Sequence, residues 1–262
     1  MEYNIVAQGS EMVQLMSSTR DSNRKGKGPM NSDGEGSNDD RGGFILEEEP
    51  EASRGKFMLV GKLWASRPIN VKAAIDTMVR LRNPIKAITG NVVDAKERTF
   101  VFRFDGERDK ARVLEGQPWH FEKFVWCFNE PNESGKVTDV LLYHFPIWSR
   151  VYDLPISERS SEANIRRIGA SLGTFLEADS GSNCELNRAI RVRIIRDIRK
   201  PLQATIPITM KDNKVVHFDV KYERLPIFCY RCGVMRHEEK DCEHGPYEED
   251  ELHFGEWLRA SP

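Results

Sequence analysis

Three cysteines and one histidine in the C-terminal part of the sequence lie at spacings that suit a single metal ion. Two residues separate Cys229 from Cys232, four separate Cys232 from His237, and four separate His237 from Cys242. Two cysteines this close can reach one metal from a tight turn, and Zn²⁺ prefers four sulfur and nitrogen ligands in a tetrahedron. Because the set leaves no open coordination position, the sequence predicts one Zn²⁺ ion with a structural, non-catalytic role.

The charges around these ligands do not favour a polyanion. The segment from residue 221 to 244 holds five positive and five negative side chains, and three thiolates on one Zn²⁺ add about one negative charge. A better basic patch lies upstream, where Asp197 is the single acidic residue in a 13-residue stretch that contains Arg188, Arg191, Arg193, Arg196, Arg199 and Lys200.

Alternation along that stretch places Arg191 and Arg193 on one face of a strand and Val192 and Ile194 on the other. The arginine face can track phosphates, or it can be a solvated strand of alternating polarity, and both readings stay open. The predicted nucleic-acid contacts are four arginines of this stretch and three residues near the metal ligands: Arg188, Arg191, Arg193, Arg196, Tyr230, Arg231 and Arg236.

Composition limits the class of protein that holds this site. The chain has 262 residues, a formal net charge of -2 and 39% hydrophobic residues. So small a net charge creates no global field that steers the protein to nucleic acid. Residues 1–53 are rich in serine, glycine, asparagine and charged side chains, so we expect that segment to be disordered.

The sequence also indicates the compartment. It contains no run of 18 apolar residues, which argues against a membrane-spanning helix, and its first residues lack the basic head and apolar core of a secretory signal. Five cysteines, three of them beside a histidine, favour a reducing environment. We expect an intracellular protein with no membrane partner, and the nucleus and the cytoplasm are equally compatible.

Residues 54–134 show the pattern of an α+β domain. Strands are expected over residues 56–64, 85–94, 99–104 and 124–130, with one helix capped by Asn70 and another capped by Asp105 and stopped by Gly116. Phe100, Phe102 and Phe104 alternate onto one face of their strand. The order β-α-β-β-α-β is the ferredoxin-like arrangement, which is also the topology of the RNA-recognition module.

Residues 140–225 form a second predicted α+β region without a clear internal repeat of the first. A strand over residues 141–152 is expected to be interrupted by Pro146, and a helix to run from Ser160 to Gly173. Three further strands follow over residues 189–198, 203–210 and 215–222. The metal segment then occupies residues 226–244. Residues 245–262 form an acidic tail that we expect to pack on the body through Trp257 and Leu258.

Several motifs together resemble one known family. The metal segment CYRCGVMRHEEKDC is similar to the retroviral nucleocapsid type of zinc knuckle. With LVGKLWASRPIN, VLEGQPWHFEKF, YERLPIFCYRCG and FGEWLRA, residues 54–260 resemble plant proteins that join domain of unknown function 4283 to a CX2CX4HX4C (CCHC-type) zinc knuckle. Those proteins are related to the gag-like first reading frame of non-LTR retrotransposons. The resemblance implies zinc, binding to RNA or single-stranded DNA, and a retrotransposon-derived origin.

The sequence departs from the patterns that this resemblance brings with it. Arg236 precedes the histidine where the nucleocapsid type has glycine. Tyr230, after the first cysteine, suits the position that stacks a base, whereas the carboxylate of Glu239 does not suit the second stacking position. In residues 54–134, Leu59, Thr99 and Val101 stand where the recognition module usually carries aromatic rings, so an RRM-like fold without its stacking platform is expected.

Two functions remain in view. We expect a zinc-dependent, non-catalytic protein that binds RNA or single-stranded DNA. The alternative is an adaptor that uses the knuckle to bind other proteins and has no nucleic-acid role. An enzyme is not expected, and neither is a small-molecule substrate, because the sequence has no glycine-rich phosphate loop, no paired carboxylates in a defined context and no nucleophile with a base at motif spacing.

Overall fold

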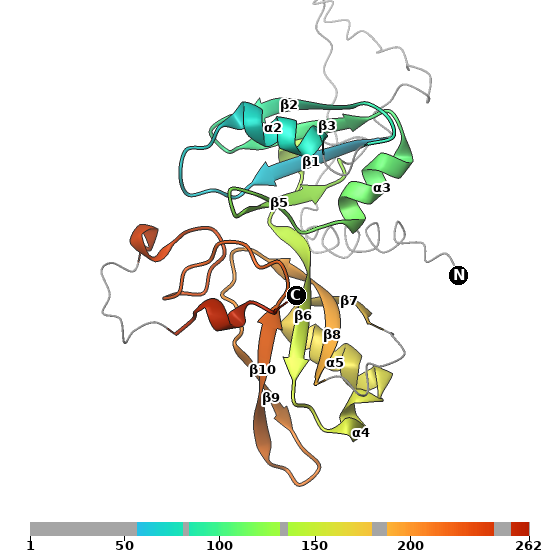
Figure 1. Ribbon diagram of the computed structural model, residues 1–262, viewed down its shortest axis with the longest axis vertical. Coiled ribbons are helices and arrows are strands. Elements are labelled where there is room, and N and C mark those ends of the chain that lie inside the picture. The colour runs from blue at the N-terminus through green and yellow to red at the C-terminus, as the bar shows by residue number, and fades with distance from the viewer. Residues whose placement is uncertain (1–56, 81–83, 132–135, 180–187, 244–252, 262) are drawn as a thin grey trace, which may run out of the picture. The chain divides into compact units, whose positions relative to one another are not determined.

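The computed structural model describes residues 57–80, 84–131, 136–179, 188–243 and 253–261, drawn in colour in Figure 1. The disorder predicted for residues 1–53 lies outside these ranges. The described part is a mixed α+β structure with two five-stranded antiparallel sheets and few helices. None of the described helices has the length and apolar character needed to cross a membrane.

The first sheet has the strand order β2-β3-β1-β5-β4. Its elements are β1 (Met58–Leu63), α2 (Val71–Val79), β2 (Ile88–Asp94), β3 (Thr99–Phe104), α3 (Glu107–Glu115), β4 (Trp119–Phe121) and β5 (Phe124–Asn129). Without β4, the sequence of elements is β-α-β-β-α-β, which confirms the predicted RRM-like arrangement.

Strand β4 was not predicted. It is only three residues long and forms a hairpin with β5 at the edge of the sheet. The two turn residues, Glu122 and Lys123, have φ values of 49° and 69°. Such a two-residue turn normally carries asparagine and glycine, which tolerate positive φ. Because Glu-Lys gives no such signal, the hairpin could not be recognised from the sequence.

The helix boundaries follow local capping. The side chain of Asn70 accepts a hydrogen bond from the backbone N–H of Ala73 and starts α2, as predicted. The predicted cap of α3 at Asp105 is wrong, and Gly106 is the N-cap. The backbone N–H of Asp105 donates to the carbonyl of Ala87, which keeps Asp105 at the end of the strand. Gly116 ends α3, as predicted.

The phenylalanines of β3 face the helices and form the core of this domain. Phe100, Phe102 and Phe104 are buried, as predicted, and pack with Trp126 of β5. Leu59 lies opposite Phe102 in the antiparallel ladder, so both side chains point to the same face. The expectation that Leu59 occupies an exposed stacking position is therefore wrong. The face without helices carries Val60 and Val101 instead.

The second sheet has the strand order β7-β8-β6-β10-β9. Its elements are β6 (His144–Tyr152), α4 (Ile156–Arg159), α5 (Glu162–Leu172), β7 (Thr174–Ala178), β8 (Ala189–Asp197), β9 (Thr205–Thr209) and β10 (Val215–Tyr222). The strands predicted after residue 189 are confirmed, whereas β7 was not predicted.

Two boundaries predicted for this region are wrong. Pro146 does not interrupt β6, because β6 pairs with β10 only from Ser149 to Val151, so at Pro146 no second ladder needs the missing N–H. The N-cap of α5 is Ser161 rather than Ser160, and its side chain accepts a hydrogen bond from the backbone N–H of Asn164. Gly173 ends the helix, as predicted.

The two sheets share one plan, although the sequence shows no clear repeat. Replacing β1 to β5 by β6 to β10 converts the first strand order into the second, and α5 takes the place of α2. Helix α3 has no counterpart, because residues 198–204 between β8 and β9 contain no helix. The core beneath this sheet is completed by Phe228, Met235 and Leu258, which come from later in the chain.

Candidate metal centre and sheet surfaces

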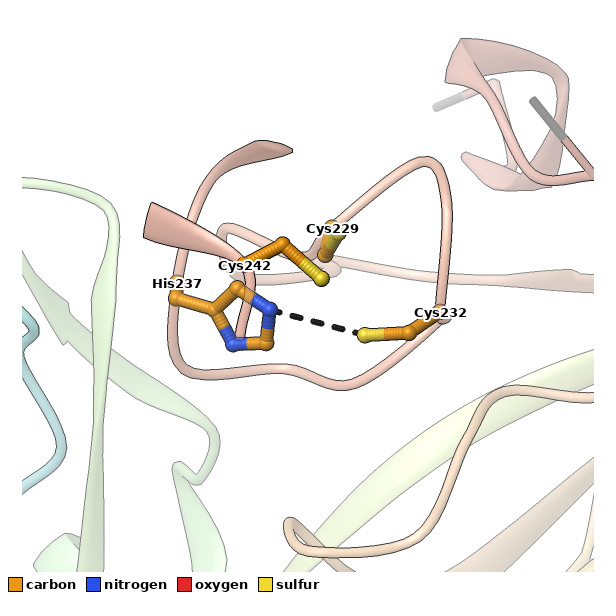
Figure 2. A group of neighbouring side chains, drawn as sticks. All are labelled: Cys229, Cys232, His237 and Cys242. Carbon is orange, nitrogen blue, oxygen red and sulfur yellow. Dashed lines mark hydrogen bonds between the residues drawn. The ribbon is translucent and has the colours of Figure 1, made fainter. Parts of the chain in front are cut away.

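The four predicted ligands converge on one point. The ligand atoms of Cys229, Cys232, His237 and Cys242 all lie within 4.8 Å of one another, and Figure 2 shows the four side chains turned toward a common centre. The Sγ of Cys232 lies 3.5 Å from the Nε2 of His237. Tetrahedral ligands at Zn–S bonds of ~2.3 Å are separated by about 3.8 Å. The set therefore fits one structural Zn²⁺ ion.

A tight turn brings the first two cysteines together. The backbone N–H of Gly233 donates to the carbonyl of Cys229 at 2.8 Å, and the N–H of Cys229 donates to Val234 at 3.0 Å. Gly233 has a φ of 72°, and a Cβ there would lie 2.6 Å from the ring of Phe254. Because Arg236 is not among the described residues with positive φ, the left-handed residue of this loop is Gly233.

Burial makes the first ligand dependent on the metal. Cys229 is fully buried, and this burial raises the pKa of its thiol to about 12. The positive charge of a bound Zn²⁺ favours the thiolate, so binding of the metal releases the proton. Glu239 supports the same loop, because its carboxylate accepts the backbone N–H of Tyr230 at 2.7 Å. This bond gives Glu239 a structural role.

The metal loop packs as part of the second sheet's domain and does not form a separate folding unit. Phe228 and Met235 lie in the same apolar core as the buried side chains of β6, β8 and β10. The carbonyl of Gly233 accepts the backbone N–H of Leu202, in the connection between β8 and β9. These residues occupy the core in the domain that lacks a counterpart of α3.

The C-terminal segment packs on the metal loop. The backbone N–H of Phe254 donates to the carbonyl of Tyr230, and the hydroxyl of Tyr230 donates to Glu256. Leu258 is fully buried, whereas Trp257 is 56% exposed, so of the two predicted anchors Leu258 is confirmed and Trp257 is wrong. Burial, together with Glu256, raises the pKa of Tyr230 to about 12. Tyr230, the predicted base-stacking residue, is thus engaged by the tail.

The arginines near β8 are paired with acidic groups. Arg188 contacts Asp153, Arg191 contacts Glu223 and Asp179, and Arg193 contacts Glu177 and the carbonyl of Glu115. As predicted, Arg191 and Arg193 share a face opposite the buried Val192 and Ile194.

The remaining predicted contacts differ in exposure. Arg196 points into the other side of β8, where it is buried and donates to Gln203 and to the carbonyls of Leu172 and Pro201. A side chain held this way does not face solvent. Of the two arginines near the metal ligands, Arg236 is exposed and Arg231 is partly exposed.

One side chain on the arginine face was not singled out from the sequence. Trp148 of β6 lies opposite Arg193 of β8, and the guanidinium of Arg191 lies 3.8 Å from the centroid of the Trp148 ring. The alternation in HFPIWSRVY places Trp148, Arg150 and Tyr152 on one face of the strand. That alternation is the signal that could have found Trp148.

The corresponding face of the first sheet is covered. Val60 and Val101 pack against Leu142, with Val137 and Val140 of the segment between the sheets around them. The indole N–H of Trp64 donates to the carbonyl of Leu142 at 2.6 Å. The chain's own connection therefore occupies the surface on which the RNA-recognition module carries its aromatic rings.

Comparison with known proteins identifies the metal segment. Residues 196–244 match the family model described as a zinc knuckle. The matched segment begins near the end of β8 and includes β9 and β10, in agreement with the shared core. No curated protein matches the chain.

The solved structures that are similar to the chain include two pairs of RNA-recognition domains. RNA recognition domains 1 and 2 of Sex-lethal from Drosophila melanogaster share 13% identity, cover 53% of this chain and 86% of that one, and give a TM-score of 0.23. The first two RRM domains of the yeast poly(U) binding protein share 12% identity with this chain. The match covers 63% of this chain and 97% of that one, and the TM-score is 0.21. The assignment of an RRM-like fold rests on the strand orders and helix positions given above.

Proposed function

We propose that this protein is a non-catalytic, zinc-dependent binder of single-stranded nucleic acid. The convergence of Cys229, Cys232, His237 and Cys242 in a zinc knuckle carries the proposal. The arginine face of β8 belongs to the domain that contains this knuckle, on the side of the sheet opposite the core in which Phe228 and Met235 pack, and offers a second site for phosphates. The resemblance of residues 54–260 to gag-like proteins supports a retrotransposon-derived origin and an intracellular location.

The ion pairs of the arginine face set the expected strength of binding. Because Arg188, Arg191 and Arg193 each have a carboxylate partner, a phosphate must displace or share that partner. Each phosphate contact with a single strand contributes a slope of about -0.7 in log K against log salt. We expect binding that weakens with salt, with a slope smaller in magnitude than three unpaired arginines would give.

The test is a binding titration of the zinc-loaded protein at low salt. Single-stranded RNA, single-stranded DNA and duplex DNA of the same sequence are titrated with and without a chelator, and zinc is then restored. We expect binding to single strands, loss with the chelator and recovery with zinc. Lys72→Gln, which removes one exposed positive charge from α2, serves as the control for net charge. Absence of any single-strand binding by the zinc-loaded protein would overturn the proposal.

The alternative, a protein-binding adaptor, is favoured by one observation. Trp257 is 56% exposed beside the tail contacts that engage Tyr230, and a large exposed aromatic side chain is typical of a protein interface. A partner captured on the immobilised protein should survive nuclease treatment and be lost on Trp257→Ala. If capture depends on intact nucleic acid, the adaptor function is ruled out for that partner.

A further inference from the structure

Two of the three surfaces suited to unpaired bases are already engaged within the chain. The face of the first sheet without helices is covered by Val137, Val140 and Leu142. The ring of Tyr230 in the knuckle is held by the C-terminal segment through Phe254 and Glu256. The third surface is the face of the second sheet opposite α5, where Trp148 lies.

This third surface carries aromatic rings and cations in alternation. Trp148, Arg150 and Tyr152 point outward from β6, and each is only partly buried. Arg191 from β8 lies 3.8 Å from the Trp148 ring centroid, and the Nζ of Lys221 from β10 lies 5.4 Å from the Tyr152 ring centroid. We call these five residues the β6 aromatic face.

Hydrogen bonds hold the cations of the β6 aromatic face in place. Glu223 accepts two bonds from Arg191, from Nε and Nη2, each 2.8 Å long, and a third from Nε of Arg150 at 2.6 Å. These bonds outweigh the effect of burial and lower the pKa of Glu223, so the carboxylate stays ionised. These bonds fix the guanidinium of Arg191 over the indole of Trp148. Because the Arg191 side chain is already ordered, less conformational entropy is lost when a ligand binds to it.

The charge of this surface favours stacking over phosphate attraction. Four cations, Arg150, Arg191, Arg193 and Lys221, face four carboxylates, those of Glu177, Asp179, Glu223 and the exposed Asp219 of β10. A surface with no net charge does not attract a polyanion, whereas indole, phenol and guanidinium planes stack on bases of any sequence. The carboxylates add acceptors that suit the 2′-hydroxyl donor of ribose, which deoxyribose lacks.

We propose that the β6 aromatic face binds unpaired bases of single-stranded RNA. One base stacks on the guanidinium plane of Arg191, which the Trp148 ring supports from below, and a second stacks on Tyr152. Because the two rings are four residues apart on one strand, they lie ~13 Å from each other and receive separate bases. The inference rests on the proposed function and assigns its base-stacking site to the second sheet rather than to the knuckle.

The test uses the zinc-loaded full chain and a labelled single-stranded RNA of 12 nucleotides, with DNA of the same sequence. Stacking on aromatic side chains contributes about 1–3 kcal/mol per base, so Trp148→Ala should weaken RNA binding roughly 5- to 150-fold. Trp148→Phe should retain part of the affinity. Arg191→Lys keeps the charge but loses the flat guanidinium, and should also weaken binding. Ile156→Ala, which removes a large apolar side chain that is 70% exposed, is the control and should bind as the unmodified chain does.

A second readout reports Trp148 directly. RNA should quench part of the tryptophan fluorescence of the unmodified chain, and that part should be absent in Trp148→Phe. This measurement remains informative if Trp148→Ala does not fold, which thermal unfolding would reveal. Weaker binding to DNA than to RNA is expected from the carboxylate acceptors.

The outcomes separate this inference from the proposed function. If the unmodified chain binds RNA in a zinc-dependent manner and both Trp148 variants bind equally well, the β6 aromatic face is not the site and the proposed function stands. If Arg191→Lys binds as tightly as the unmodified chain while Arg191→Gln does not, charge rather than stacking holds the RNA, and the inference is wrong. Failure of the unmodified chain to bind any single strand removes both.

Discussion

Gly233 shows how one residue can serve the metal loop in two ways. Its φ of 72° lies in the left-handed region, which disfavours side chains, and the space above its Cα is filled by the ring of Phe254. The backbone conformation brings Cys229 and Cys232 together, and the missing side chain lets the C-terminal segment approach.

A substitution at this position should weaken the metal site. Gly233→Ala adds ~1 kcal/mol of backbone strain and a contact at 2.6 Å with the Phe254 ring. We expect zinc affinity to fall about tenfold, measured by competition with a zinc-binding dye. Gly106→Ala is the control, because its Cβ would meet only the flexible side chain of Lys86 at 3.3 Å. Equal zinc affinity for both variants would show that Gly233 is dispensable.

His120 should make the stability of the fold sensitive to pH. The Nε2 of His120 is buried without a hydrogen-bond partner, and burial, with Arg224 and Arg259 nearby, lowers its pKa from 6.5 to about 4. The folded state therefore keeps His120 neutral, while the unfolded state takes up a proton below pH 6.5. The free energy of unfolding should fall as the pH drops from 6.5 toward 4, by about 1.4 kcal/mol at pH 5.5.

Urea unfolding at pH 7.5 and pH 5.5, with zinc present, measures this effect. His120→Gln should lose less stability between the two pH values than the unmodified chain. The comparison between the two proteins cancels acid-induced loss of zinc, which affects both. Equal losses in the two proteins would show that His120 does not carry the pH dependence.

At the scale of single residues, local patterns could be predicted and distant partners could not. The four metal ligands follow from spacing over 14 residues, because one short turn brings them together. The partner of Arg191, by contrast, is Glu223, 32 residues away in the turn after β10. No local pattern reveals that pairing. The sequence therefore suggested a free basic patch, whereas ion pairs in the structure neutralise much of its charge.

Among the elements, the connection between the sheets has a role beyond linking. Residues 136–142 contain a short 3-10 helix, Val137–Asp139, and Leu142 is buried against Val60 and Val101. This packing removes apolar side chains of β1 and β3 from water.

Neighbouring leucines in this connection provide a matched test. Leu142 is 7% exposed and Leu141 is 47% exposed. Leu142→Ala should lower the free energy of unfolding by about 2–4 kcal/mol, because burial is lost and a cavity remains. Leu141→Ala should change it by less than ~0.5 kcal/mol. Urea unfolding followed by circular dichroism gives both values, and similar values for the two variants would contradict the proposed packing.

Elements with strong periodicity were predicted well, and short edge strands were not. Strand β3 and helix α2 have a clear alternation and a clear cap, so their positions agree with the structure. Strands β4 and β7, with three and five residues, lie at the edges of their sheets. Their pairing depends on partners elsewhere in the chain, which local periodicity does not show.

For the described molecule as a whole, the metal ion belongs to the core of the second sheet. Phe228 and Met235 flank the ligands and pack with the buried residues of β6, β8 and β10. Removal of zinc should therefore destabilise the whole second domain and not only the loop.

Hydrogen exchange measured on peptides can locate this effect. With a chelator, peptides from β8 and β10 should lose protection, while peptides from β1 and β3, in the other core, should keep most of theirs. Restoring zinc should restore protection, which distinguishes metal loss from irreversible damage. Loss of protection confined to residues 229–242 would show that the knuckle folds independently.

The shared strand order of the two sheets could not be predicted, because it is a property of pairing between strands. The second sheet lacks a counterpart of α3, so its pattern of helices and strands does not match that of the first. The metal loop and Leu258 of the tail fill the place that α3 occupies in the first domain. Both come after β10, the last strand of the second sheet, so a search for a repeat among the strands and helices does not include them.

In the second domain, residues near the C-terminus complete the core in place of a helix, and this affects how the chain folds during synthesis. The strands of the first sheet end at Asn129 and the connection that covers Val60 and Val101 ends at Leu142, so this domain can fold once Leu142 has left the ribosome. The second core requires Phe228, Met235 and Leu258, so the apolar sides of β6 and β8 stay without their cover until the last of these has emerged. At ~5–20 residues per second, this interval lasts several seconds. A nascent chain stalled after β10 would therefore be a target for chaperones, whereas one stalled just after Leu142 would leave fewer apolar side chains uncovered.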